Sequence, residues 1–271
     1  ASWLIVRSRL PGFSLRHGVD NAWMGTFGNV ICLGAGAVPM QTYYLHLCGL
    51  PLGPGVGLMT LQYVFHKTTV LLYATVLLLW HRSWLAAHTT GVLHYLPAAY
   101  AVVAGVIVGL VLLCASPLVQ QLARWALGKL PQSETRRERW QTQLDTLSAE
   151  SRHLLAEKRR CLALLAVHGV KLFLLFSIPY LCIRFMGLPC SLTFGQVQLL
   201  GALMFFLSNA LPNVAGMGSI ETAFLLVFGC FFSRAQTMSI LMLYRIASYY
   251  WVTAASAVGF FGAQRRAQRL V

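Results

Sequence analysis

The stretch that decides the fold is VGLMTLQYVFHKTTVLLYATVLLLW, which occupies residues 56–80. Lys67 carries its only formal charge, and the rest is apolar or uncharged. A helix needs roughly 20 predominantly apolar residues to cross the hydrocarbon core of a bilayer. This stretch meets that requirement, so it predicts a membrane-spanning helix.

Three more stretches meet the same requirement: Tyr95 to Ser116, Leu162 to Ile183, and Gln236 to Gly262, the last despite Arg245 inside it. Hydrophobic residues make up 57% of the 271-residue chain, charged residues make up 10%, and the mean hydropathy is +0.65. Soluble domains average about 45–50% apolar and about 25% charged residues. The composition therefore excludes a soluble enzyme and a disordered chain. It predicts an all-α integral membrane protein, a polytopic helical bundle forming one membrane domain over residues 1–271.

Two further apolar stretches, residues 19–54 and residues 196–232, are interrupted by proline and glycine. Irregular backbone at membrane depth is tolerated only where protein or water surrounds it. Opposed pairs of broken helices indicate a transporter-type substrate site, whereas the alternative is two kinked helix pairs that only pack. The residues expected to form or bound the turns are Pro39 in the first stretch and Pro212, Gly216 and Gly218 in the second.

The basic residues predict the orientation in the membrane. Of the 21 lysines and arginines, 15 lie in the N-terminal stretch, in residues 120–160, or in the C-terminal tail. The positive-inside rule places these three segments in the cytoplasm. With these three segments on one side, the number of membrane crossings between them fixes where each interrupted stretch ends. Both interrupted stretches must return to the membrane face from which they start. We therefore expect two broken hairpins of the re-entrant type, which enter the membrane from opposite faces.

The polar connector over residues 120–160 allows two interpretations. Its apolar residues Trp140, Leu144, Leu147 and Leu154 recur at helical spacing. That pattern is typical of an amphipathic helix lying along the membrane face. Because the segment also carries nine of the 21 basic residues and five of the seven acidic residues, a solvated connector is the alternative.

Four charged residues fall inside the predicted membrane segments. Lys67, Lys171 and Arg245 lie 11, 9 and 9 residues into their stretches, and Glu221 is the acid expected at intermediate depth. Ionisable side chains in membrane segments are costly and usually functional. We expect Glu221 to pair with Arg245, which leaves the lysines to neutralise a phosphate. Snorkelling to an interface is the alternative for the lysines.

The chain carries no recognisable catalytic or cofactor pattern. It lacks paired carboxylates and the sequences of serine hydrolases, zinc proteases, Walker A loops and dinucleotide-binding loops. The seven cysteines show no C-x-x-C spacing, so neither a metal nor a disulfide framework is expected. The net charge of +14 comes without interleaved basic and aromatic residues, which argues against a nucleic-acid partner. We expect no metal and no cofactor, and no catalytic residues.

Two motifs resemble one known family. The run LPNVAGMGSIE, residues 211–221, is followed by an apolar helix and then by Arg245, Tyr249 and Tyr250. This order resembles the closing signature of the bacterial lysylphosphatidylglycerol synthase/flippase membrane-domain family. The run VPMQTYY, residues 38–44, followed by CGLP, resembles the first hairpin of its Firmicutes-type members. The resemblance covers essentially the whole chain, with the motifs in the same order and spacing.

The resemblance implies a domain that binds, and in its best-understood members translocates, anionic or aminoacylated phospholipids. It also implies a multi-pass location in the bacterial plasma membrane and further helices before Ala1. We therefore expect a lipid flippase or lipid-binding transporter for such a phospholipid or for a polyprenyl-phosphate-like lipid. The residues expected at the headgroup site are Glu221, Arg245, Lys67, Lys171, Gln41, Tyr44 and Tyr249.

The alternative function is the membrane half of a phosphatidylglycerol lysyltransferase that needs a separate transferase domain. The expected partners are a membrane phospholipid and, in addition, a second copy of the chain or a partner transferase. The chain departs from the family pattern at residues 34–38, which read GAGAV without an acid, and at His66 and Lys67, where many members carry an arginine or an acid. The resemblance therefore leaves the identity of the lipid open.

Overall fold

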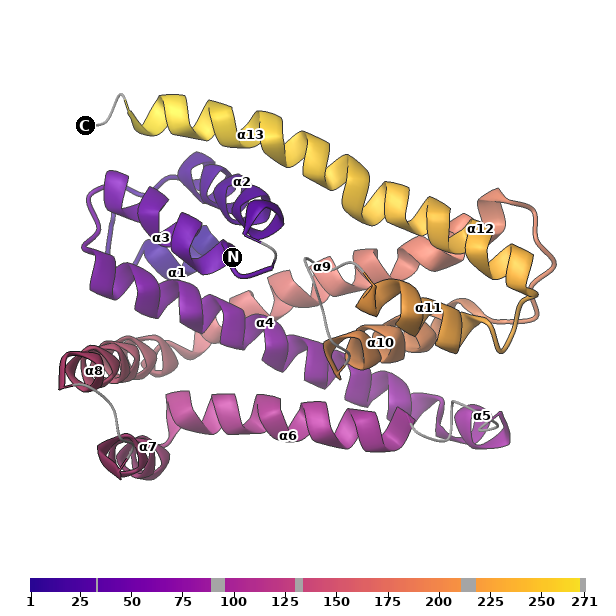
Figure 1. The fold of residues 1–271 in the computed structure, drawn as a ribbon, viewed down its shortest axis with the longest axis horizontal. Coiled ribbons are helices and arrows are strands. Elements are labelled where there is room, and N and C mark those ends of the chain that lie inside the picture. The colour runs from indigo at the N-terminus through magenta and orange to yellow at the C-terminus, as the bar shows by residue number, and fades with distance from the viewer. Residues whose placement is uncertain (33, 89–95, 130–133, 211–217, 269–271) are drawn as a thin grey trace.

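The structure is a computed structural model that describes residues 1–32, 34–88, 96–129, 134–210 and 218–268. All of its regular elements in these ranges are helices (Figure 1). They are α1 (Ser2–Val6), α2 (Leu15–Ile31), α3 (Ala37–Leu47), α4 (Leu52–Trp80), α5 (Arg82–Ala87), α6 (Leu96–Ala115), α7 (Pro117–Lys129), α8 (Glu134–Ala156), α9 (Lys158–Phe185), α10 (Phe194–Ala210), α11 (Ser219–Phe228), α12 (Arg234–Arg245), the π-helix η2 (Ile246–Tyr250) and α13 (Trp251–Ala267).

Two helices in the described part of the chain, α4 and α9, are long and apolar enough to cross a membrane. The pair α6 and α7 makes a third span if it is counted as one, although the two axes meet at 101°. Pro117 begins α7 at this bend, because proline has no backbone N–H with which to continue the preceding helix. The fold is therefore polytopic and all-α, as the sequence predicts.

The C-terminal helix is continuous from Arg234 to Ala267 but changes its pitch on the way. Ser233 begins it with a capping box, in which its hydroxyl accepts a hydrogen bond from the Gln236 amide while the Gln236 side chain accepts one from the Ser233 amide. The π-helix η2 follows immediately after Arg245. A π-helical turn adds one residue per turn and commonly marks a functional position inside an α-helix.

The first hairpin consists of α2 and α3, which lie within residues 19–54 apart from the first turn of α2. Glycine allows the two helices to approach closely, because a Cβ on Gly36 would overlap the carbonyl oxygen of Gly28, and one on Gly25 would lie 2.6 Å from Gln41. The turn contains Gly34 at φ +96°, a conformation that glycine adopts without steric cost. With 11 residues, α3 rises only about 16 Å, which is half the thickness of a bilayer core.

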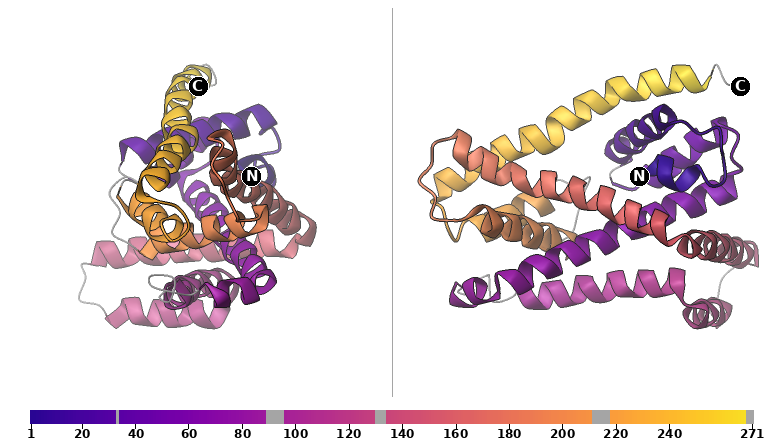
Figure 2. Two further views of the ribbon diagram at one scale, coloured as in Figure 1. Left: turned by 90° about the vertical axis from the view of Figure 1, so that its right-hand side faces the viewer. Right: turned by 180° about the vertical axis from the view of Figure 1, so that it is seen from behind.

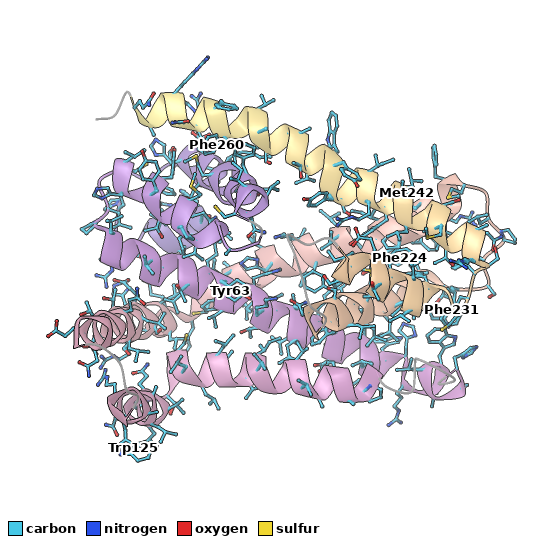
Figure 3. All side chains as sticks on the ribbon, in the orientation of Figure 1. Tyr63, Trp125, Phe224, Phe231, Met242 and Phe260 are labelled. Atoms are coloured by element: carbon cyan, nitrogen blue, oxygen red, sulfur yellow. The ribbon has the colours of Figure 1, made fainter. Side chains whose placement is uncertain are left out.

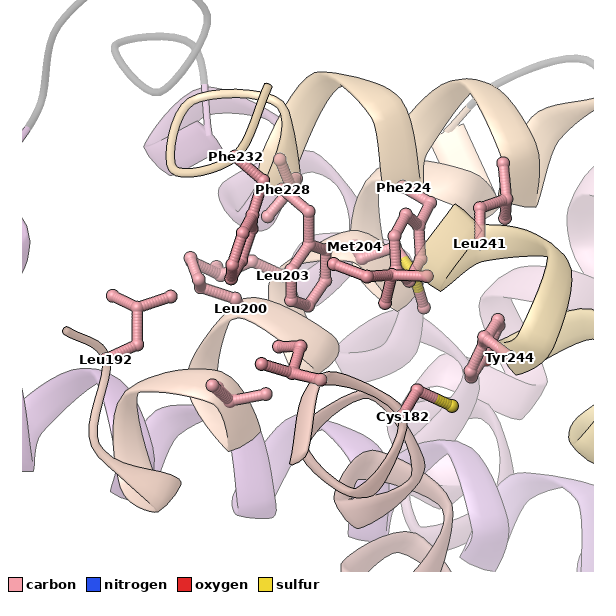
Figure 4. Close-up of a cluster of buried hydrophobic side chains, with 14 of the residues drawn as sticks. Cys182, Leu192, Leu200, Leu203, Met204, Phe224, Phe228, Phe232, Leu241 and Tyr244 are labelled. Carbon is pink, nitrogen blue, oxygen red and sulfur yellow. The ribbon is translucent and has the colours of Figure 1, made fainter. Parts of the chain in front are cut away.

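The second hairpin consists of α10 and α11, which lie within residues 196–232 apart from the first two residues of α10. Its core is aromatic: Phe224 and Phe228 stack at 4.3 Å between ring centres and pack with Met204 of α10 and Tyr244 of α12 (Figure 4). Gly218, at φ +89°, begins α11. At 10 residues, α11 is also too short to cross a bilayer.

The long helices run along the long axis of the molecule, while α7 and α8 cross it at one end (Figures 1 and 2). The first hairpin, α8 and the C-terminus all lie at that same end, and α5 lies at the other. Arg9 pairs with Glu150 of α8 at 3.0 Å, which joins two of the basic segments. The connector over residues 120–160 is largely helical, because α7 and α8 cover most of it. Leu154 on α8 is buried in the core.

Apolar side chains cover the outward surfaces of the long helices (Figure 3). Trp80, Phe185 and Val258 are among the most exposed of them. Trp125 projects from α7 at the edge of the molecule (Figure 3). Large exposed apolar surfaces are rare in water-soluble monomers, and they are what a surrounding bilayer requires.

Candidate functional site

Lys67 lies in the middle of α4, and its ammonium group faces α10. Its Nζ donates a 2.8 Å hydrogen bond to Asn209 Oδ1. The same nitrogen lies 5.3 Å from the ring centre of Tyr63 and 5.7 Å from that of Phe205, which is within the range of cation–π attraction. These contacts hold the ammonium group against α10, beside two aromatic rings.

Lys67 and Asn209 form the polar end of a cavity of about 230 Å³ between α4, α6 and α10. Most of the remaining lining is apolar and includes Val102, Val106 and Leu110 of α6. The volume is several times the ~30 Å³ that one water molecule occupies in the liquid. The cavity therefore offers one ammonium group beside apolar walls, a combination that suits a charged headgroup next to its acyl chains.

Glu221 and Arg245 form an ion pair between the second hairpin and the C-terminal helix. Arg245 Nε lies 2.9 Å from Glu221 Oε1. The other carboxylate oxygen, Oε2, accepts a 2.7 Å hydrogen bond from the Gly218 amide at the start of α11. The carboxylate thus sits at the N-terminus of a helix, where negative charge is favoured. The pair is the one that the charge count predicts.

The Arg245 guanidinium is buried, with 4% of its side chain exposed. Its face lies 4.2 Å from the ring centre of Tyr249, inside the π-helical turn. Nη2 has no hydrogen-bond partner among the described residues. Because a guanidinium carries five N–H donors, this side of Arg245 retains the capacity to bind an oxyanion.

Lys171 does not line the Lys67 cavity. It lies one turn after His168 on α9 and acts electrostatically on His168 and on His66. His66 in turn precedes Lys67 on α4, so the two lysines flank one pair of histidines. Neither lysine takes part in an ion pair within the described ranges. The site residues therefore divide into three groups: Lys67, Lys171 with the histidines, and Arg245 with Glu221 and Tyr249.

Gln41 and Tyr44 lie elsewhere, in the core of the first hairpin. Tyr44 is fully buried, and its hydroxyl lies 3.3 Å from Asp20 Oδ2. Gln41 donates a weak 3.4 Å hydrogen bond to the Asn21 carbonyl. Pro39 occupies the first turn of α3, where proline is tolerated. The structure thus gives Gln41 and Tyr44 packing roles, and their side chains do not meet the three groups above.

Asp20 is a buried acid that the sequence reasoning passed over when it placed Glu221 alone among acids in the membrane. Its carboxylate pairs with Arg266, whose Nε lies 2.9 Å from Oδ2 and whose Nη2 contacts Oδ1. A usable signal existed, because Asp20 is the only acid in the first 133 residues. The pair fastens the first hairpin to the end of α13.

Two of the expected turn residues, Pro212 and Gly216, lie outside the described residues. Gly218 lies inside them, and its positive φ begins α11. A side chain there would be strained, because L-residues rarely adopt this backbone conformation. Within the described ranges, no three His, Cys, Asp or Glu side chains are grouped to hold a metal ion.

Comparison with known proteins agrees with this architecture. The family model for the lysylphosphatidylglycerol synthase TM region matches residues 2–256, nearly the whole chain. The chain belongs to this family. No curated protein sequence and no solved structure gives a significant match. Membership of the lysylphosphatidylglycerol synthase TM family places the chain in a membrane and fits a lipid-related role, as a flippase or as the membrane part of a synthase.

Proposed function

We propose that this chain binds an anionic or aminoacylated phospholipid and moves its headgroup across the bilayer. A polyprenyl-phosphate-like lipid presents the same phosphate chemistry and is included in this class. The observation that carries the proposal is the cavity at Lys67, where an ammonium group without an acidic partner among the described residues lies beside apolar walls. Lys67 is half-buried beside apolar side chains, where a cation without a counter-ion is less well solvated than in water, so an anionic ligand stabilises this arrangement.

In this mechanism the phosphate accepts the hydrogen bond that Lys67 otherwise donates to Asn209. The acyl chains lie along the valines of α6, and the headgroup moves through the protein. The second hairpin supplies both Asn209, on α10, and Glu221, on α11. A displacement of this hairpin therefore changes the partners of Lys67 and of Arg245 together, which links headgroup binding to hairpin movement.

The test is translocation of a fluorescent anionic phospholipid in liposomes that contain the purified protein. Lys67→Met keeps much of the side-chain length but removes the charge. A hydrogen bond to a charged group contributes about 1.5–3 kcal/mol, so the rate should fall by tenfold or more. Lys158→Met, which removes an exposed lysine at the start of α9, is the matched control and should transport normally. Equal rates for both variants would contradict the proposal.

The family match supports a second candidate, the membrane part of a phosphatidylglycerol lysyltransferase. Here the same cavity presents phosphatidylglycerol to a separate transferase domain. The lipids of cells that express the chain alone, or together with such a domain, distinguish the two functions. Lysylphosphatidylglycerol that forms only in the second case favours the synthase, whereas translocation by the chain alone favours the flippase.

We propose further that the N-terminal stretch, the 120–160 connector and the C-terminus face the cytoplasm of a bacterial cell. The support is the concentration of 15 of the 21 basic residues in these segments and the ion pairs Arg9–Glu150 and Arg266–Asp20 at one end of the molecule. In a cysteine-free variant, single cysteines beside Arg152 and Arg266 should resist an impermeant thiol reagent in intact cells. Cysteines beside Arg82 and Arg184 should react, and the reverse pattern would invert the orientation.

A further inference from the structure

A pair of histidines lies where the two long spanning helices meet. His66 is in the middle of α4 and His168 is in the middle of α9. Their ring centres are 5.3 Å apart with 44° between the ring planes. At this separation a small rotation of either ring allows one imidazole to donate an N–H hydrogen bond to the other. The pair can therefore hold a single proton between its two rings.

Three of the four ring nitrogens lack a hydrogen-bond partner in the part of the chain that the structure describes. They are Nδ1 of His66 and both nitrogens of His168, and all three are buried. The His168 residue is only 5% exposed. Buried polar atoms nearly always have a partner, and a neutral imidazole has one donor and one acceptor to satisfy. These nitrogens therefore point to a ligand that supplies or receives a proton.

The charged groups that face the pair are all cations. Lys67 adjoins His66 on α4, and Lys171 lies one turn after His168 on α9, within electrostatic range of both histidines. No described carboxylate forms an ion pair with either lysine or either histidine here. A proton added to the pair would place a further positive charge beside these cations, so its binding requires an anion nearby. The same cations repel a metal ion.

We propose that His66 and His168 form a proton-binding site that fills when an anionic headgroup binds at Lys67, the residue that follows His66. The proton comes from hydronium in the solvent, whose O–H bond breaks as an N–H bond forms on an imidazole nitrogen, and no bond between heavy atoms changes. By thermodynamic linkage, the anion strengthens proton binding and the proton strengthens anion binding by the same factor. While the lipid occupies the site, the proton on the imidazole compensates one unit of the headgroup's negative charge. This inference rests on the proposed lipid-binding function.

The test is calorimetric titration of the detergent-solubilised protein with dihexanoyl phosphatidylglycerol at pH 7. Titrations in PIPES and in Tris, whose heats of ionisation differ, give the number of protons taken up per bound lipid. The wild type should take up close to one proton, since one unit of charge is compensated. The double variant His66→Gln/His168→Gln should bind more weakly and take up none. The matched control His46→Gln/His153→Gln, at two exposed histidines, should behave as the wild type does.

Each outcome decides a different point. Wild-type binding with the same heat in both buffers overturns the proton site but leaves the lipid-binding function intact. Proton uptake that survives in the double variant overturns the assignment to these two histidines. Absence of any binding overturns the proton site together with the proposed function. A parallel titration with glycerol 1-phosphate should be at least tenfold weaker, and equal affinity would assign the site to a free anion and overturn the lipid-coupled form. The comparison between the two buffers uses the wild type alone, so it does not depend on whether a variant folds.

Discussion

The two broken hairpins are built differently although each is fastened to the same C-terminal helix. The first closes on glycine, with the backbones of α2 and α3 in contact at Gly28 and Gly36. The second closes on aromatic side chains, among them Phe224 and Phe228. Backbone contact leaves no freedom to slide, whereas an aromatic interface can repack. From this comparison we expect the second hairpin to be the moving element and the first to be its fixed counterpart.

The ion pairs that join the two hairpins to the C-terminal helix also differ in which member, the acid or the arginine, is buried. In the first pair the acid is buried, with 3% of the Asp20 side chain and 38% of the Arg266 side chain exposed. In the second pair the arginine is buried, with 4% of Arg245 and 31% of Glu221 exposed. Removing the more exposed member strands a buried charge, while removing the buried member leaves a charge that water or a headgroup can reach. The two hairpins should therefore respond oppositely to loss of the acid.

The largest effect is expected in the second hairpin. Glu221→Gln leaves Arg245 buried without its carboxylate, so it should cost about 3–5 kcal/mol of stability and abolish translocation. Arg245→Met should cost less than half as much, since Glu221 keeps its bond to the Gly218 amide. Thermal melts in detergent measure both. Glu157→Gln breaks a more exposed ion pair with Arg160 and serves as the control, with a loss of at most about 1 kcal/mol.

In the first hairpin, removing the arginine should destabilise the protein more than removing the acid does, and the loss of stability should be somewhat smaller than in the second hairpin. Arg266→Gln strands the buried Asp20 carboxylate, whereas Asp20→Asn leaves a half-exposed arginine near the end of α13. We expect Arg266→Gln to lower the melting temperature more than Asp20→Asn does. Arg265→Gln, at an exposed neighbour, should leave it unchanged. If loss of the acid were the more destabilising change in both hairpins, the difference in burial between the two ion pairs would not determine the loss of stability.

The smallest of the three stability effects concerns the glycines. Gly36→Ala should cost about 1–3 kcal/mol, because its Cβ overlaps the backbone of Gly28. Gly201→Ala on α10 should be tolerated, since its Cβ would meet the Phe176 side chain at an ordinary 3.4 Å. Gly105→Ala on α6, with open space around it, is the control. Equal losses at positions 36 and 201, in melts under the same conditions, would remove the distinction between a rigid and an adaptable hairpin.

Much of the architecture could be predicted from local sequence, because continuous apolar runs determine spans and proline with glycine determines their breaks. The Glu221–Arg245 pair could be predicted from charge alone, since an acid and an arginine that both fall inside apolar segments stabilise each other. The Asp20–Arg266 pair could not, because its members are 246 residues apart and Asp20 stands at the edge of an apolar run. A charged residue near a predicted membrane interface is ordinarily solvated. Asp20 is buried only because α2 packs against α13.

The direction of side chains is a second property that the local sequence leaves undetermined. The motif containing Gln41 and Tyr44 predicts a hairpin, but an apolar helix has no polar stripe to show which face turns inward. The approach of His66 to His168 depends on how α4 crosses α9, which no local pattern encodes. The π-helical turn after Arg245 could not be predicted from the sequence either, because one extra residue in a turn leaves the composition of the segment unchanged.

The central claim, that mid-membrane cations hold an anionic lipid headgroup, is tested most directly by the lipids that remain with the protein during purification. Mass spectrometry should find anionic phospholipid enriched on the wild type relative to the membrane from which it is extracted. The enrichment should fall in Lys67→Met, fall further in Lys67→Met/Lys171→Met, and persist in Lys158→Met. A wild type that carries lipids in the proportions of the bulk membrane, or a double variant that retains the full enrichment, would contradict the account.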